Sequence, residues 1–139
     1  MDEQLRLAYL RTTYWAETPL GEIRLRIGVA NPRLTELLIE FSVEEWAFIT
    51  ACNPSSKSVS DDENERLQQA LKAVLRIDGF TVFNGAGTGD DGQWPPEPSF
   101  LVLGISTAKA IALGRVYGQN AIVAGIIGAV PYLIECIES

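Results

Sequence analysis

The sequence contains no histidine and only two cysteines. Without histidine, the chain lacks the most frequent general base, and Ser-His-Asp or Cys-His catalysis is impossible within it. Two cysteines cannot form a tetrahedral zinc site alone. Cys52 and Cys136 lie far apart in apolar runs, so we expect two buried free thiols rather than a disulfide. We therefore expect no metal site and no cofactor.

Long hydrophobic runs are also missing. The longest uncharged apolar stretch covers residues 121–134, is interrupted by two glycines and a proline, and is too short to span a bilayer. The opening residues, Met1 to Gln4, are acidic and polar and do not match a signal peptide. The sequence favours a cytoplasmic location.

Positive charge is scarce: 11 Lys and Arg residues stand against 18 Asp and Glu residues, for a net charge of −7. A charge of this sign repels phosphate backbones, which disfavours nucleic acid as a partner. Apolar residues make up 47% of the 139 positions, enough to form a hydrophobic core. Length and composition together predict one domain over residues 1–139.

Hydrophobic periodicity predicts both strands and helices. Ile23, Leu25 and Ile27 alternate with charged residues, which is typical of a strand with one wet face. Similar reasoning predicts strands at 8–15, 22–27, 46–52, 80–83, 100–105, 120–124 and 130–136, and helices at 33–41, 61–77 and 107–117. We expect an α+β fold, with a mixed, largely antiparallel sheet of about five to seven strands packed with two or three helices.

Residues 84–98 contain four glycines and three prolines and are predicted to form one long irregular loop. Within them, residues 87–92 match the pattern G-x-G-x-x-G of dinucleotide-binding proteins. No helix is predicted after the last glycine, and Asp90 and Asp91 would repel a pyrophosphate. The match is therefore interpreted as a plain loop.

Glu97 is the most informative residue, since Pro96 and Pro98 enclose it and hold it in extended geometry. Other polar or planar side chains follow or precede predicted buried strands. The predicted ligand-binding residues are Asn53, Asn64, Trp94, Glu97, Ser99 and Gln119. Together they predict a cleft for a small polar ligand, with the 84–98 loop as a lid. If the protein is an enzyme, Glu97 is the candidate catalytic residue, as a general acid or base.

Two alternatives use other surfaces. Arg11, Arg24 and Arg26 are expected together on the wet face of the first hairpin, near Tyr9, Tyr14 or Trp15; arginines beside aromatic rings are typical of RNA or single-stranded nucleic-acid binding. The other alternative is a protein-interaction module without a pocket, which an exposed apolar patch on the C-terminal hairpin would favour.

Several segments resemble an uncharacterised bacterial family catalogued as domain of unknown function 3293. The resemblance is carried by Tyr9, residues 12–14, 47–54, Asn64 with Arg66 and Leu67, Trp94, and residues 97–102 and 114–121. It covers roughly Tyr9 to Val123 and implies a small stand-alone bacterial protein, without supplying an activity. The chain departs from the family pattern at Cys52, where an aromatic residue is expected.

Overall fold

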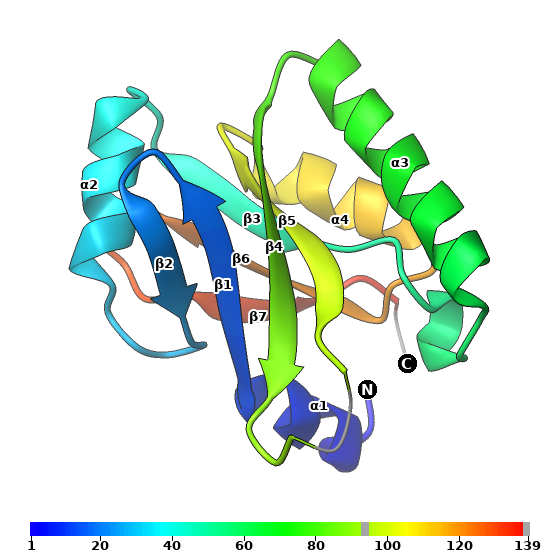
Figure 1. Ribbon diagram of the computed structural model, residues 1–139. Helices are drawn as coiled ribbons and strands as arrows, with labels where there is room; N and C mark the ends of the chain where they lie inside the picture. Colours follow the sequence, from blue (N-terminus) through cyan, green and yellow to red (C-terminus); the bar gives the residue numbers. More distant parts are fainter. Residues whose placement is uncertain (93–94, 138–139) are drawn as a thin grey trace.

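A curled antiparallel sheet of seven strands forms the centre of the computed structural model, which describes residues 1–92 and 95–137 (Figure 1). The strands are β1 (Thr12–Thr18), β2 (Gly21–Leu25), β3 (Glu45–Ile49), β4 (Thr81–Gly89), β5 (Glu97–Leu103), β6 (Ala121–Ile126) and β7 (Tyr132–Glu135). They are ordered β2-β1-β4-β5-β3-β6-β7, and all six neighbouring pairs are antiparallel.

Four α-helices accompany this sheet in the described part of the chain: α1 (Glu3–Leu10), α2 (Pro32–Glu40), α3 (Asp61–Ile77) and α4 (Thr107–Val116). A short 3₁₀ helix, η1, covers Pro54–Ser56. The predicted α+β class and largely antiparallel sheet are confirmed. The helix that the sequence prediction lacked is α1.

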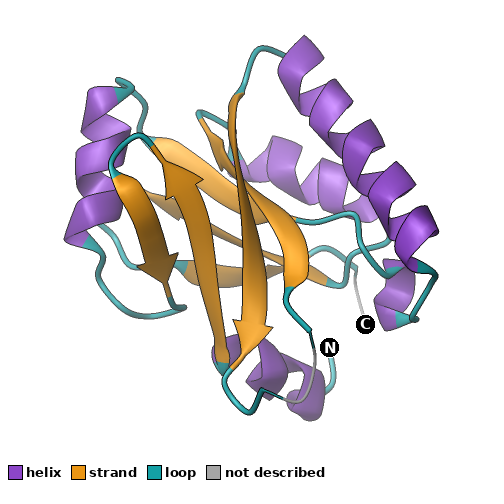
Figure 2. Ribbon diagram, in the orientation of Figure 1, coloured by secondary structure: helices purple, strands orange, loops and turns teal. Residues whose placement is uncertain are grey.

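Helices lie against both faces of the sheet (Figure 2). Apolar side chains pack between them in two clusters. On one face, α3 and α4 pack over β3, β5 and β6 through Leu71, Leu75 and Leu113. On the other, α2 packs inside the curl through Leu34, Leu37 and Leu38. Because β3 is buried on both faces, its residues Trp46 to Ile49 are all apolar.

The curl brings the two edge strands together at one end of the sheet. The backbone N–H of Gly28, just after β2, donates to the carbonyl of Pro131, just before β7, at 2.8 Å. At the other end, α1 leads directly into β1, and the Met1 ammonium group lies 2.7 Å from the Glu135 carboxylate at the end of β7. Helix α1 therefore connects the far ends of β1 and β7 (Figure 1).

The prediction of a strand over residues 8–15 is wrong at its start. Residues 8–10 belong to α1, and the strand begins at Thr12. Asp2 caps this helix, since its side chain accepts a hydrogen bond from the Leu5 N–H at 2.9 Å. The capping residue and the helix-forming residues after it outweigh the aromatic character of Tyr9.

The predicted loop over 84–98 is wrong at both ends, and the lid expected from it stays a prediction. Residues through Gly89 belong to β4, and β5 begins at Glu97. The glycines serve close approach: a Cβ atom at Gly85 would lie 2.0 Å from the Trp15 carbonyl oxygen, and one at Gly87 would lie 3.3 Å from the Tyr14 ring. Only glycine lets β4 lie this close to β1.

Two further expectations concern compartment and redox state. No helix of the described residues combines the length and apolar character needed to cross a membrane. Cys52 and Cys136 are both buried and both free, as predicted.

Candidate functional site

A pocket of about 820 Å³ lies at the end of the sheet that α1 covers. We call it the Glu97 pocket. Leu5, Ala8 and Tyr9 of α1 form one side, together with Tyr14 of β1. The remaining lining comes from Thr12 of β1, from β3, β4 and β5, from the start of β6 with Gln119 before it, from the segment between β3 and α3, from the first turns of α3, and from Pro95 and Pro96. Strand ends therefore meet loop residues here, as the sequence analysis expected.

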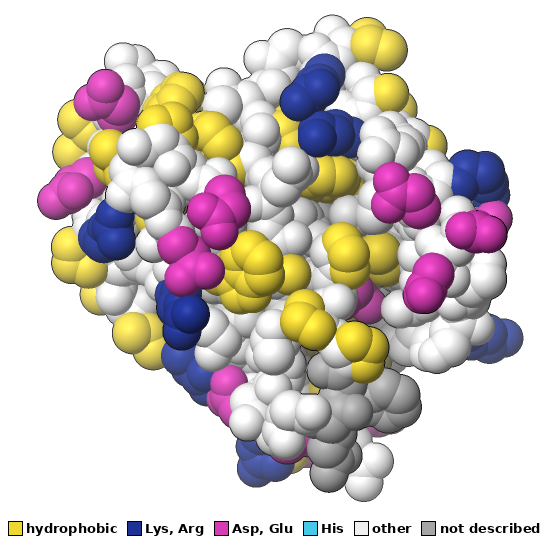
Figure 3. Space-filling model, viewed as in Figure 1, with side chains coloured by type: hydrophobic (Ala, Val, Ile, Leu, Met, Phe, Trp, Pro, Cys, Tyr) yellow, Lys and Arg dark blue, Asp and Glu magenta, His cyan; other side chains and the backbone are white. Residues whose placement is uncertain are grey.

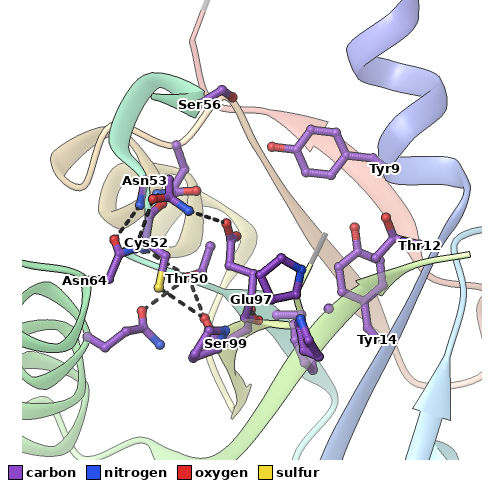
Figure 4. Close-up of a pocket in the computed structure, with 18 of the residues that line it drawn as sticks. Tyr9, Thr12, Tyr14, Thr50, Cys52, Asn53, Ser56, Asn64, Glu97 and Ser99 are labelled. Atoms are coloured by element: carbon purple, nitrogen blue, oxygen red, sulfur yellow. Dashed lines mark hydrogen bonds between the residues drawn. The ribbon is translucent and has the colours of Figure 1, made fainter. Parts of the chain in front are cut away.

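The structure brings Asn53, Asn64 and Glu97 into one hydrogen-bonded chain (Figure 4). Asn53 follows β3, has the left-handed φ of 48° that asparagine tolerates, and donates from Nδ2 to Glu97 Oε2 at 3.1 Å. Asn64 Nδ2 in turn donates to Asn53 Oδ1 at 2.9 Å.

A backbone hydrogen bond fixes the orientation of both asparagine amides in this hydrogen-bonded chain. The N–H of Asn53 donates to Asn64 Oδ1 at 2.8 Å, and only an oxygen can accept there. Asn64 must therefore present its amide nitrogen to Asn53 Oδ1, which also accepts from the Val59 N–H at 3.2 Å. Consequently, Asn53 can only present donor hydrogens to Glu97.

Glu97 itself is partly buried, and burial raises the pKa of its carboxyl group, while the hydrogen bond from Asn53 partly offsets this. Within the described part of the chain, no hydrogen bond reaches its second oxygen, Oε1, and no Lys or Arg side chain lies in the pocket lining. As a carboxylate, Glu97 thus offers an open acceptor; as a carboxylic acid, it offers a proton. Its surroundings disfavour the charged form.

Two tyrosines that the sequence analysis did not assign to the cleft lie opposite the asparagines, with Glu97 between the two groups (Figure 4). Burial raises the pKa of Tyr9 to about 12, and the nearby Glu97 carboxylate contributes. Burial also raises the pKa of Tyr14, which packs edge-to-face on Phe48 at 5.3 Å. Both phenols stay neutral near pH 7. Tyr9 was missed because helix α1 was not predicted.

Ser99 and Gln119 line the pocket, but their side chains hydrogen-bond to backbone carbonyls rather than facing the open space of the pocket. The Ser99 hydroxyl donates to the Glu97 carbonyl at 3.1 Å. The Gln119 amide donates to the Cys52 and Tyr117 carbonyls at 3.0 and 3.2 Å. These bonds position the neighbours of Asn53 and Glu97. The sixth predicted residue, Trp94, lies outside the described residues.

Arg24 of the first hairpin lies on the outer face of the sheet, away from Tyr14, whereas Arg11 caps the C-terminus of α1 and does not belong to the hairpin. Trp15 pairs with Arg24, whereas Tyr14 pairs with Leu25 and faces the core. Arg24 is 3.0 Å from Glu22, and Arg26 Nη2 is 2.7 Å from Asp90. Figure 3 shows Lys and Arg side chains in separated groups among Asp and Glu.

The G-x-G-x-x-G match is not a phosphate site. Gly87 and Gly89 belong to β4, and Asp90 accepts hydrogen bonds from Arg26 and Thr13. In the described residues, no group of three or more Cys, Asp or Glu side chains is placed to hold a metal ion.

Comparison with known proteins gives a match to one family, and this match is by sequence. No curated protein and no solved structure matches it. The sequence pattern of one family, described as "Protein of unknown function (DUF3293)", matches residues 49–122. This segment covers more than half of the chain and contains Asn53, Asn64, Glu97 and Gln119. The chain therefore belongs to the DUF3293 family.

Proposed function

We propose that this protein is a cytosolic, bacterial protein that binds a small polar ligand in the Glu97 pocket. The observation that carries the proposal is the hydrogen-bonded chain from Asn64 through Asn53 to Glu97, which ends at an open carboxylate oxygen inside a cavity. A mostly apolar pocket with a few convergent polar groups is the usual form of a small-molecule site.

The surrounding residues support binding because they hold the polar groups rigidly before a ligand arrives. Gln119 and Ser99 are buried and bonded to backbone, and Thr50 Oγ1 donates to the Pro98 carbonyl at 2.7 Å. Preorganised groups lose little conformational entropy on binding. A buried polar network stabilises a fold less than well-packed apolar residues would, which favours a role of this network in binding.

An enzymatic form of the proposal gives Glu97 the role of general acid or base. Its raised pKa moves the carboxyl group toward the range in which proton transfer near neutral pH is efficient. Turnover separates the two forms: a compound that the wild type converts, with turnover lost in Glu97→Gln by far more than binding is weakened, indicates an enzyme, and binding without any turnover in the wild type indicates a binding protein.

The proposal is tested by a thermal-shift screen of small polar compounds, with hits measured by calorimetry. Asn53→Ala removes the hydrogen bond that holds Glu97 in place and should weaken the binding of a true ligand by about tenfold. Glu36→Gln, at an exposed position on α2, is the matched control and should bind like the wild type. Absence of any binding compound, or equal binding by all three proteins, would refute the proposal.

A second candidate function is protein interaction through the β6–β7 hairpin. Ile126, Val130 and Tyr132 are exposed there, and β7 is an edge strand of the sheet. Light scattering of the wild type and of Ile126→Ser would test self-association: a dimer that the substitution dissociates would support this candidate, and two monomers would exclude pairing between copies.

A further inference from the structure

We infer that the ligand of the Glu97 pocket is an organic cation, whose protonated nitrogen group (ammonium, amidinium or guanidinium) meets Glu97 between the asparagines and the tyrosines. This inference rests on the proposed function and names the ligand's chemical class.

The charges around the pocket are of one sign. Three carboxylates line it, those of Asp61, Glu65 and Glu97. All eleven Lys and Arg residues lie within the described residues, and none of them belongs to the lining. Arg26 is paired with Asp90 and Arg66 with Glu63, and the exposed Lys57, between Ser56 and Ser58 of the lining, does not itself line the pocket. A phosphate or carboxylate ligand would find no cation here, whereas a positive ligand would find three acids.

The Glu97 carboxylate also lacks a charged partner, although the residue is partly buried. Charges removed from water are usually paired or bound to metal. Within the described residues, the only hydrogen bond to this carboxylate is the neutral one from Asn53. A cationic nitrogen at Oε1 would supply both the missing charge and the missing donor, and charge-assisted bonds of this kind are about twice as strong as neutral ones.

The other residues that line the pocket favour a positively charged ligand over a negatively charged one. Asn53 Oδ1 already accepts two hydrogen bonds, so the N–H groups of a cation have Glu97 Oε1 rather than this amide as their acceptor. Tyr9 and Tyr14 add aromatic rings on the far side of Glu97, and aromatic faces attract ammonium and guanidinium groups. Gly87 keeps the space beside the Tyr14 ring open, since a Cβ there would lie 3.3 Å from the ring.

Proton linkage follows from the groups that face Glu97. Tyr9 on α1, Tyr14 on β1 and Cys52 after β3 all have pKa values raised mainly by burial, so they remain neutral below pH 8. Asp61 and Glu65 of α3 add carboxylates. The raised pKa of Glu97 means that a cation must drive off a proton as it binds at mildly acidic pH. Cation affinity should therefore rise with pH.

Three probes of matched shape test the inference: benzamidine, benzamide and benzoate, which are positive, neutral and negative at about pH 7. Calorimetry on the full chain should give benzamidine an affinity at least about tenfold higher than benzamide, with no measurable benzoate binding. Glu97→Gln should abolish this preference and leave benzamide within about threefold, while Glu36→Gln should bind all three like the wild type.

The outcomes are distinguishable. Benzamide or benzoate binding as tightly as benzamidine, with loss in Asn53→Ala, would overturn the cation inference and leave the pocket as a ligand site. A benzamidine preference that survives in Glu97→Gln would also overturn it, because the charge recognised would lie elsewhere. If none of the probes binds, the inference fails, and the compound screen decides the proposed function separately.

Discussion

Asn53 Nδ2 donates to Glu97 Oε2 at 3.1 Å, which joins a left-handed residue after β3 to the first residue of β5, 44 positions later. The bond gives the carboxylate its neutral donor, and Asn64 dictates which end of the Asn53 amide faces it. The acid–base behaviour of Glu97 therefore depends on a residue that holds no charge.

The first prediction concerns stability. Burial raises the pKa of Glu97, so the folded state binds its proton more tightly than the unfolded state, and this contribution to stability is lost as pH rises above the ordinary glutamate value through the raised one. Glu97→Gln should be more stable than the wild type at pH 8 by on the order of 1 kcal/mol, as is common when a functional group is removed. Urea denaturation at pH 4 and pH 8 measures this. An equal difference at both pH values would contradict it.

The second prediction concerns the direction of the amide chain. Asn64→Asp keeps an acceptor for the Asn53 N–H but removes the donor to Asn53 Oδ1, which should cost about 1–3 kcal/mol of unfolding free energy. Because two acceptors would face each other, the cost should shrink when acid protonates the introduced carboxyl group. Chemical denaturation over pH 3.5 to 8 gives the measurement.

Asn120→Asp is the matched control for this experiment. Asn120 donates from Nδ2 to the Ser56 hydroxyl, which can donate in return to an introduced carboxylate. Its stability should change little. Equal losses in the two variants would show that the direction of the Asn53–Asn64 pair is unimportant.

The third prediction concerns Tyr9. Its pKa of about 12 arises mainly from burial and then from Glu97. In the folded state it should ionise late, so stability is lost as pH rises above the ordinary tyrosine value of about 10. Absorbance near 295 nm during alkaline titration should lose one high-pH transition in Tyr9→Phe. An unchanged titration curve in that variant would contradict the raised pKa of Tyr9.

The fourth prediction tests packing between α4 and the segment after β7. A Cβ atom at Gly114 would lie 2.6 Å from Cys136 Sγ. Gly114→Ala should destabilise the protein by about 1–3 kcal/mol, although alanine favours helix. Cys136→Ala removes the obstructing sulfur, so the double variant should be markedly less destabilised than the sum of the two single changes. Additive losses would show that the two positions do not touch.

Part of the fold could be read from local pattern. Alternation at Ile23, Leu25 and Ile27 predicted β2, and the apolar stripe through Leu67, Leu71 and Leu75 predicted α3 within its observed bounds. These signals work because a strand or helix shows its buried face in its own periodicity. The glycines at 85 and 87 misled, because a glycine required for close strand approach is identical in sequence to one that loosens a loop.

The sequence by itself determined the absence of histidine chemistry, the acidic balance and the choice of Glu97, because these depend only on which residues are present and on the prolines beside them. Tertiary structure alone decided that Asn53 and Asn64 lock together and turn a donor toward Glu97, that Gln119 and Ser99 hold backbone, and that Tyr9 and Tyr14 form the far side of the pocket. The bonds from Asn53 to Glu97 and from Gln119 to Cys52 join residues 44 and 67 positions apart, and no local pattern encodes such contacts.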